Sequence, residues 1–170
     1  MADVYGWKGF ADNDYVSTTY KSEWMNTTTT DDWDIIHTYE GNDTIYAGGG
    51  DDELYGGEGD DALSGDTGVD KLYGEAGADS FYFFGEADTG DVFANQADTI
   101  YDFETQDQIL LLGTYTYAGD TSMPADGQFS IWQNVADWIV TYNTPNDDGW
   151  HDIVVKGDVP QESDITSYIA

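Results

Sequence analysis

The chain has 170 residues and a formal net charge of −31, the balance of 35 acidic and 4 basic side chains. Such an acidic chain is a poor partner for nucleic acid or an anionic membrane, because phosphate contacts require Lys and Arg. Disorder or a simply solvated surface would also be compatible with this charge. Aromatic residues, however, make up 15% of the chain and include six Trp, which argues against disorder. We therefore expect one folded domain in which bound cations neutralise many of the carboxylates.

The sequence shows neither cysteine chemistry nor a membrane segment. Without Cys, the chain can form neither disulfides nor thiolate metal sites. The N-terminal residues MADVYGWKGFADND have no basic stretch followed by an apolar run, so we expect no cleavable secretory signal there. The longest apolar run covers residues 109–112, whereas a transmembrane helix needs about 20 apolar residues. We expect no insertion into a membrane.

Residues 1–37 are rich in Thr and aromatic residues and show no helical period, which favours short strands and turns. Residues 29–37 match the nine-residue period of the next segment, with Asp34 and Ile36 at its acidic and apolar places but without its glycines. We interpret residues 1–37 as an N-terminal cap that includes a degenerate turn from residue 29. The aromatic side chains should pack within this cap, and a sugar-binding face is their alternative role.

Residues 38–82 consist of five consecutive nine-residue units, TYEGNDTIY, AGGGDDELY, GGEGDDALS, GDTGVDKLY and GEAGADSFY. The sixth place of every unit is Asp, and the eighth place is apolar. Five matches at one fixed period indicate a repeated structural unit that stacks on its neighbours. The sixth-place residues are Asp43, Asp52, Asp61, Asp70 and Asp79, and the eighth-place residues are Ile45, Leu54, Leu63, Leu72 and Phe81.

Residues 83–170 lose the repeat and have the pattern of strands. Residues 97–113 alternate between polar and apolar, and further strand candidates are 128–133, 137–144 and 152–156. The turn sequence PNDDG separates the last two candidates, as expected of a hairpin. We predict no helix, and therefore an all-β chain in which residues 83–170 form a C-terminal cap with antiparallel strands.

The nine-residue unit combines the features of a calcium-binding turn and a short strand. Glycines let the turn backbone adopt left-handed angles, so that its carbonyl oxygens can point at one centre, and the Asp adds a carboxylate. Six turn residues then leave three for a strand, whose single apolar side chain points inward. Oxygen ligands without His or Cys suit a hard ion such as Ca²⁺. The predicted ligand residues are Asp34, Gly41, Asp43, Gly48, Gly50, Asp52, Gly57, Gly59, Asp61, Gly65, Gly68, Asp70, Gly77 and Asp79.

Two nine-residue units should form one coil, so that every second unit stacks directly on its equivalent in the coil before. Stacking predicts one aspartate column of Asp34, Asp52 and Asp70 and a second of Asp43, Asp61 and Asp79. Each ion should bridge two aspartates of a column, which gives about three to five ions. Without metal the columns hold like charges close together, so the calcium-free chain should be unfolded or expanded.

The units resemble the RTX nonapeptide G-G-x-G-x-D-x-U-x, a calcium-binding repeat. GGEGDDALS matches it completely, and AGGGDDELY departs from it only by Ala47 at the first place. The segment ADSFYFF…ADTIYDFETQDQILLL and the ending IVVKGDVPQESDITSYIA are similar to the region after the repeats in serralysin-type proteases and alginate-epimerase R-modules. This chain departs from that region by Leu110, where an Asp commonly follows the Ile.

The resemblance implies a right-handed parallel β-roll, with residues 38–82 as the roll. It also implies calcium binding outside the cell and export by a type I secretion system through an uncleaved C-terminal signal. The expected partners are therefore calcium ions and the secretion machinery.

The sequence offers no catalytic motif. His37 and His151 are not spaced as metal ligands and there is no H-E-x-x-H, so the zinc-protease activity of serralysins is not expected. The leading hypothesis is a non-catalytic, secreted calcium-binding module. The alternative is an extracellular carbohydrate-binding module that uses exposed Trp and Tyr of the caps to bind a glycan or cell surface. A third and weaker option is a small enzyme housed in residues 1–37 and the face of the roll.

Overall fold

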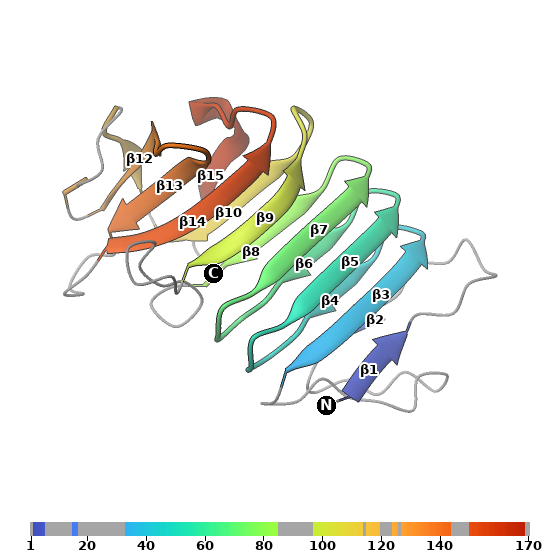
Figure 1. Ribbon diagram of the computed structural model, residues 1–170. Coiled ribbons are helices and arrows are strands. Elements are labelled where there is room, and N and C mark those ends of the chain that lie inside the picture. The colour runs from blue at the N-terminus through green and yellow to red at the C-terminus, as the bar shows by residue number, and fades with distance from the viewer. Residues whose placement is uncertain are drawn as a thin grey trace.

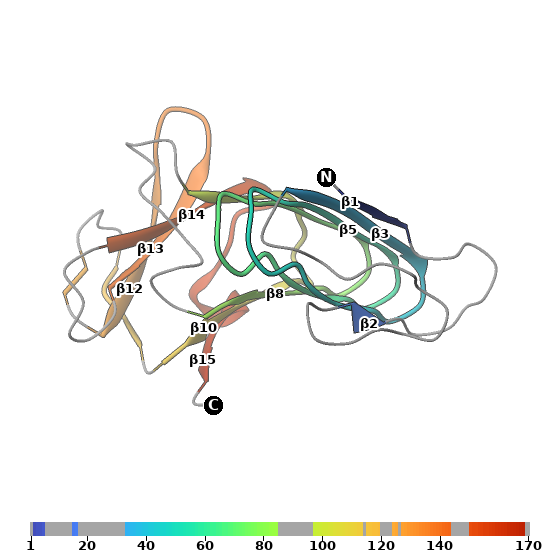
Figure 2. The same ribbon diagram turned by 90° about the horizontal axis from the view of Figure 1, so that it is seen from below.

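The computed structural model describes residues 2–5, 15–16, 33–84, 97–113, 115–119, 124–125, 127–143 and 150–168. Its strands pack as two facing sheets, which lie one behind the other in Figure 1 and are seen edge-on in Figure 2. The nine-stranded sheet has the order β1-β3-β5-β7-β9-β14-β13-β12-β11, and the six-stranded sheet has the order β15-β10-β8-β6-β4-β2. The elements are β1 (Ala2–Tyr5), β2 (Tyr15–Val16), β3 (Asp34–Glu40), β4 (Thr44–Tyr46), β5 (Glu53–Glu58), β6 (Ala62–Ser64), β7 (Lys71–Ala76), β8 (Ser80–Phe83), β9 (Asp98–Phe103), β10 (Gln108–Leu112), β11 (Thr116–Tyr117), β12 (Gln128–Gln133), β13 (Trp138–Asn143), β14 (Trp150–Gly157), the 3₁₀ turn η2 (Glu162–Asp164) and β15 (Ile165–Tyr168).

The chain alternates between the two sheets, so that each coil adds one parallel strand to each of them. Ile36 pairs with Leu54 and Leu54 pairs with Leu72, a constant step of two nine-residue units. The six-stranded sheet repeats the step, because Ile45 pairs with Leu63 and Leu63 with Phe81. The all-β class and the parallel β-roll with two repeats in each coil are therefore confirmed.

The parallel stack continues beyond residue 82. Leu72 pairs with Ile100 and Phe81 pairs with Ile109, so this step is ten residues longer than the steps before it. The chain that leads to β9 and β10 is therefore ten residues longer than the chain of each coil before it. The three predicted segments stay a prediction about domain limits, but the stacking itself does not stop at residue 82.

The eighth-place side chains form the core of the roll. They point between the two sheets because successive side chains in a strand face opposite ways. Burial of each is worth about 1.5–3 kcal/mol. Eight of them are 0% exposed: Ile36, Ile45, Leu54, Leu63, Leu72, Phe81, Ile100 and Ile109.

The expected division into a six-residue turn and a three-residue strand holds only on one side of the roll. β4 and β6 have three residues each. β5 and β7 have six, because pairing continues through the next unit, where Gly57 pairs with Glu75 and Glu58 with Ala76. The strands of the repeats are therefore longer in the nine-stranded sheet than in the six-stranded sheet.

The C-terminal segment closes the roll with antiparallel strands, as predicted. β12, β13 and β14 pair antiparallel, and the predicted hairpin partners 137–144 and 152–156 correspond to β13 and β14. β14 then joins β9 in parallel, and β15 joins β10 in parallel. The nine-stranded sheet thus continues beyond β9 through β14, β13, β12 and β11, whereas the six-stranded sheet gains β15.

The N-terminal segment also joins both sheets, since β1 pairs with β3 and β2 with β4, each in parallel. The degenerate turn aligns as expected, with Ile36 opposite Leu54. The aromatic side chains of residues 1–32, and hence their predicted packing, lie outside the described residues. No helix in the described part of the chain has the length and apolarity to cross a membrane.

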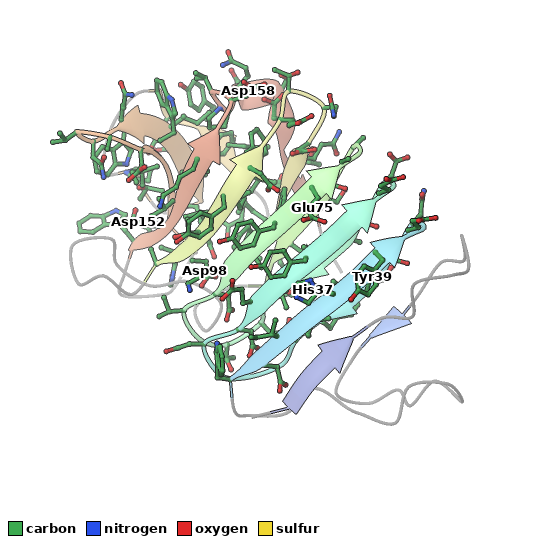
Figure 3. All side chains as sticks on the ribbon, turned by 45° about the vertical axis from the view of Figure 1, so that its right-hand side comes forward. His37, Tyr39, Glu75, Asp98, Asp152 and Asp158 are labelled. Atoms are coloured by element: carbon green, nitrogen blue, oxygen red, sulfur yellow. The ribbon has the colours of Figure 1, made fainter. Side chains whose placement is uncertain are left out.

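A ladder of stacked rings runs over the outer face of the nine-stranded sheet, starting at His37 (Figure 3). Ring centroids are 4.3 Å apart between His37 and Tyr55, 4.5 Å between Tyr55 and Tyr73, and 4.8 Å between Tyr73 and Tyr101. Lys156 Nζ lies 4.3 Å from the centroid of Tyr101 and ends the ladder with a cation–π contact. Because the rings lie within 14° of parallel, neighbours cover each other's faces and the inner rings expose only their edges.

Candidate metal centre

Two columns of buried carboxylates run along the roll at its turns, and Asp98 marks the end of one of them in Figure 3. In each column the backbone N–H of one Asp donates to Oδ1 of the Asp in the next coil, at N–O distances of 2.7–2.9 Å. All eight members are at most 3% exposed. The first column is Asp34, Asp52, Asp70 and Asp98, and the second is Asp43, Asp61, Asp79 and Asp107.

The carboxylates keep an oxygen available inside the columns. Oδ2 of Asp52 and of Asp61 is buried and accepts no hydrogen bond within the described part of the chain. Burial raises the pKa of Asp52, Asp61 and Asp79 from 3.8 to about 7, although a backbone N–H bonded to each carboxylate acts against this. The ionised columns are therefore unfavourable by themselves, and a cation beside them would supply the missing partner.

First-place glycines leave the space into which the second oxygen of each carboxylate points. A Cβ at Gly56 would lie 2.3 Å from Oδ2 of Asp61, and one at Gly65 would lie 2.0 Å from Oδ2 of Asp70. Gly74 stands in the same relation to Asp79, at 2.2 Å. A side chain at these three glycines would therefore collide with the carboxylate of the same turn, whereas Thr38 and Ala47 occupy the first place in the turns of Asp43 and Asp52.

Fourth-place glycines bring the turn backbones of successive coils into contact. A Cβ at Gly59 would lie 1.9 Å from the carbonyl oxygen of Gly41, and one at Gly77 would lie 1.7 Å from that of Gly59. On the other side, Gly68 packs on the carbonyl of Gly50 in the same way. Carbonyl oxygens are therefore stacked beside the carboxylate columns, where they can serve as further ligands.

The second place of each unit has a positive φ whatever its residue. Glycine occupies it at Gly48 and Gly57, with φ of 103° and 120°. Tyr39 and Glu75 adopt φ of 74° and 68° at the same place, at the ends of β3 and β7 (Figure 3), and so does Asp66 with 63°. The stacked roll therefore imposes this turn even on residues that disfavour it. Most of the predicted ligand residues thus lie at the turns, whereas Asp34 is the first residue of β3 and Gly57 lies within β5. Their role as ligands stays a prediction.

Fifth-place side chains add a second set of bonds between turns, which the sequence analysis did not anticipate. Asp51 Oδ1 accepts the N–H of Val69 at 3.0 Å, and Asp60 Oδ1 accepts that of Ala78 at 3.0 Å. Asn42 Oδ1 accepts the N–H of Asp60 at 3.1 Å. In these bonds the later turn donates to the earlier one, opposite to the sixth-place bonds, so these three pairs of stacked turns are joined in both directions.

Asp98 and Asp107 are column members that the sequence analysis missed. A signal was present, because Asp98-x-Ile100 and Asp107-x-Ile109 repeat the Asp-x-apolar pattern nine residues apart. The interruption before residue 97 hides their register relative to the repeats.

The donor set fits a hard cation. Among the described residues, no three His, Cys, Asp or Glu side chains gather into a metal-binding group. An ion between two turns would therefore hold two stacked aspartates and complete its shell with backbone carbonyls, an oxygen-only set that suits Ca²⁺. The basic side chains of the described region, Lys71 and Lys156, do not neutralise the columns: one pairs with Glu53 and the other lies on Tyr101, both on the outer face.

The two histidines do not form a site together. His37 is part of the ladder on β3, whereas His151 is buried on β14 with its ring 5.1 Å from that of Tyr142. In the sheet, β5, β7 and β9 separate these two strands.

Comparison with known proteins gives two kinds of similarity. Residues 28–63 and 55–89 match the family described as RTX calcium-binding nonapeptide repeat (4 copies). Among solved structures, the chain is similar to two subunits of the Azotobacter vinelandii mannuronan C5-epimerase, each with 20% identity. The first match covers 94% of this chain and 90% of that chain with a TM-score of 0.43, and the second covers 95% and 82% with a TM-score of 0.33. No match was found among the curated proteins. The chain is thus a β-roll module that carries RTX calcium-binding nonapeptide repeats.

Proposed function

We propose that this protein is a secreted, non-catalytic module that folds when its turns bind calcium outside the cell. The observation that carries the proposal is the pair of buried aspartate columns, in which Asp52 and Asp61 each keep an oxygen without a hydrogen-bond partner in the described structure. Buried anions of like charge are stable only when paired, and a divalent cation between the turns pairs them. The free energy of calcium binding then becomes free energy of folding.

The ions belong between stacked turns of the two columns. The steps foreseen from the sequence join Asp34 with Asp52, Asp52 with Asp70, Asp43 with Asp61, and Asp61 with Asp79. The register adds a further step between Asp70 and Asp98, whose carboxylate accepts the N–H of Asp70 at 2.7 Å. It also adds a sixth step, between Asp79 and Asp107, so the columns contain one step more than the upper end of the expected three to five ions.

Secretion by a type I system is part of the same proposal. Extracellular calcium modules bind their ion with Kd values of about 10⁻⁴–10⁻³ M, far above cytosolic calcium levels. A roll that needs calcium at this level stays unfolded inside the cell and folds after export. The tail that would carry the uncleaved signal ends in η2 and β15, and β15 pairs with β10 of the roll.

The alternative, a carbohydrate-binding module, receives no support from the aromatic ladder. Sugars bind to the open faces of aromatic rings, whereas the faces of Tyr55 and Tyr73 are covered by their neighbours. Trp150 is 46% exposed and is the aromatic residue of the described C-terminal cap most open to a glycan. A glycan array with and without calcium tests this alternative, and an absence of binding in both conditions removes it.

Calcium titration of chelated protein, followed by circular dichroism, tests the proposed function. The β-sheet signal should appear cooperatively with calcium, and Asp61→Ala should raise the calcium midpoint because Asp61 borders two steps. Glu162→Ala is the matched control, because it removes one charge from an exposed side chain in η2. A complete fold that is unchanged in excess chelator would contradict the proposal.

A further inference from the structure

The last step of the second column, between Asp79 and Asp107, is built differently from the steps below it. In the lower coils glycine occupies the fourth place, and Gly59 and Gly77 pack directly on the carbonyl oxygen of the equivalent glycine one coil earlier. In the last coil this place is Thr105, because Ser80 pairs with Gln108. A Cβ cannot pack on a carbonyl oxygen at the distance that the glycines allow, so the last turn stacks in another way.

The last turn closes on itself through hydrogen bonds. Asp107 N–H donates to the carbonyl of Glu104 at 3.0 Å, and Glu104 N–H donates back to Oδ2 of Asp107 at 2.8 Å. Oδ1 of Asp107 accepts the N–H of Asp79 at 2.9 Å. Both carboxylate oxygens of Asp107 are therefore bonded to backbone donors, in contrast to Asp61, whose Oδ2 is free of hydrogen bonds in the described structure.

A side-chain amide occupies the position at which an ion would meet the turn carbonyl. Gln106 Nε2 donates to the carbonyl oxygen of Gly77 at 2.8 Å and to Oε2 of Glu104 at 2.7 Å. At the step below, no hydrogen bond reaches the carbonyl of Gly59 in the described part of the chain, so this oxygen is available to a cation. An amide donor points its partial positive charge at the Gly77 carbonyl, and this opposes a cation at the same oxygen.

We infer that the turn formed by residues 104–107 ends the second column without binding calcium. The Gln106 amide and the Glu104 N–H take over the two acceptors, the Gly77 carbonyl and the Asp107 carboxylate, that calcium would bind in a lower step. Asp107 is then a positioning residue that holds the last coil against Asp79. This inference rests on the proposed function, because it states where the calcium column ends.

Native mass spectrometry in calcium counts the bound ions and tests the inference. Asp107→Asn should bind as many ions as the wild-type chain, whereas the control Asp61→Asn should bind two fewer. A loss of one ion in Asp107→Asn would overturn the inference while leaving the proposed function intact. An unchanged count in Asp61→Asn, or a wild-type chain without calcium, would overturn the proposed function instead.

A second measurement needs no variant and covers the case in which Asp107→Asn fails to fold. Crystals of the wild-type chain grown with calcium should show an anomalous peak between the turns of Asp61 and Asp79. The step between Asp79 and Asp107 should show none, and the Gln106 amide should remain on the Gly77 carbonyl. An anomalous peak at that last step would overturn the inference.

Discussion

Replacement of Asp61 by Asn should stabilise the calcium-free roll and weaken the calcium-bound one. Burial raises the pKa of Asp61 from 3.8 to about 7, so ionisation of this carboxylate destabilises the calcium-free fold. A shift of about 3 pH units corresponds to roughly 4 kcal/mol at a pH above 7, which is the upper limit of the gain from removing the charge. Asn keeps an oxygen for the N–H of Asp43, so the hydrogen bond of 2.7 Å can survive the change.

The pH dependence has a defined sign. Because the pKa is higher in the folded state, the calcium-free roll binds more protons than the unfolded chain between about pH 4 and pH 7. Its stability is therefore highest at low pH, falls as the pH rises through this window, and levels off above it. Asp61→Asn should make the slope shallower by up to about 1.4 kcal/mol per pH unit.

Urea unfolding in chelator measures both effects, with trimethylamine N-oxide added so that the calcium-free fold is populated. In saturating calcium, Asp61→Asn should lower the free energy of unfolding instead of raising it, because two steps of the column lose a charged ligand. The reasoning is refuted if Asp61→Asn destabilises the chain equally in chelator and in calcium and leaves the pH slope unchanged.

Three further predictions concern other parts of the roll. With trimethylamine N-oxide populating the calcium-free fold, calcium binding at pH 7 should release on the order of one to two protons from the three carboxylates whose pKa is raised to about 7 in that fold, and calorimetry in buffers of different ionisation enthalpy should show none at pH 9. Gly59→Ala should lower the free energy of unfolding, measured by urea with calcium, by more than about 3 kcal/mol, because its Cβ would meet the carbonyl of Gly41 at a positive φ. The control Gly119→Ala, also at a positive φ but in open space, should lower it by only about 1–2 kcal/mol. Tyr73→Leu removes two stacked contacts and should lower stability by about 1–3 kcal/mol without changing the calcium count. Tyr46→Leu, which removes one tilted ring contact at 6.1 Å among the described residues, should lower it less, and an equal loss in both would contradict the role of the ladder.

Much of the fold follows from local rules that the sequence displays. Alternation of side chains within a strand places the eighth-place residues inside, and a constant period makes equivalent residues stack. For this reason the sequence alone places Asp52 and Asp70 in one column, two units apart, as the structure has them. The oxygen-only composition of the turns likewise indicated the type of ion.

The tertiary structure decided what depends on contacts between coils or across an interruption of the period. After a ten-residue insertion, the sequence does not show whether the chain continues in the same stack. The pairing of Leu72 with Ile100 in the structure shows that it does, and this pairing places Asp98 in the first column. The direction of each carboxylate oxygen depends on the N–H of the neighbouring coil. The closing turn at Gln106 depends on the carbonyl of Gly77 in the coil before, which no local pattern specifies. The period thus determined which residues stack, and the packing between coils determined the hydrogen-bond partners of their carboxylates.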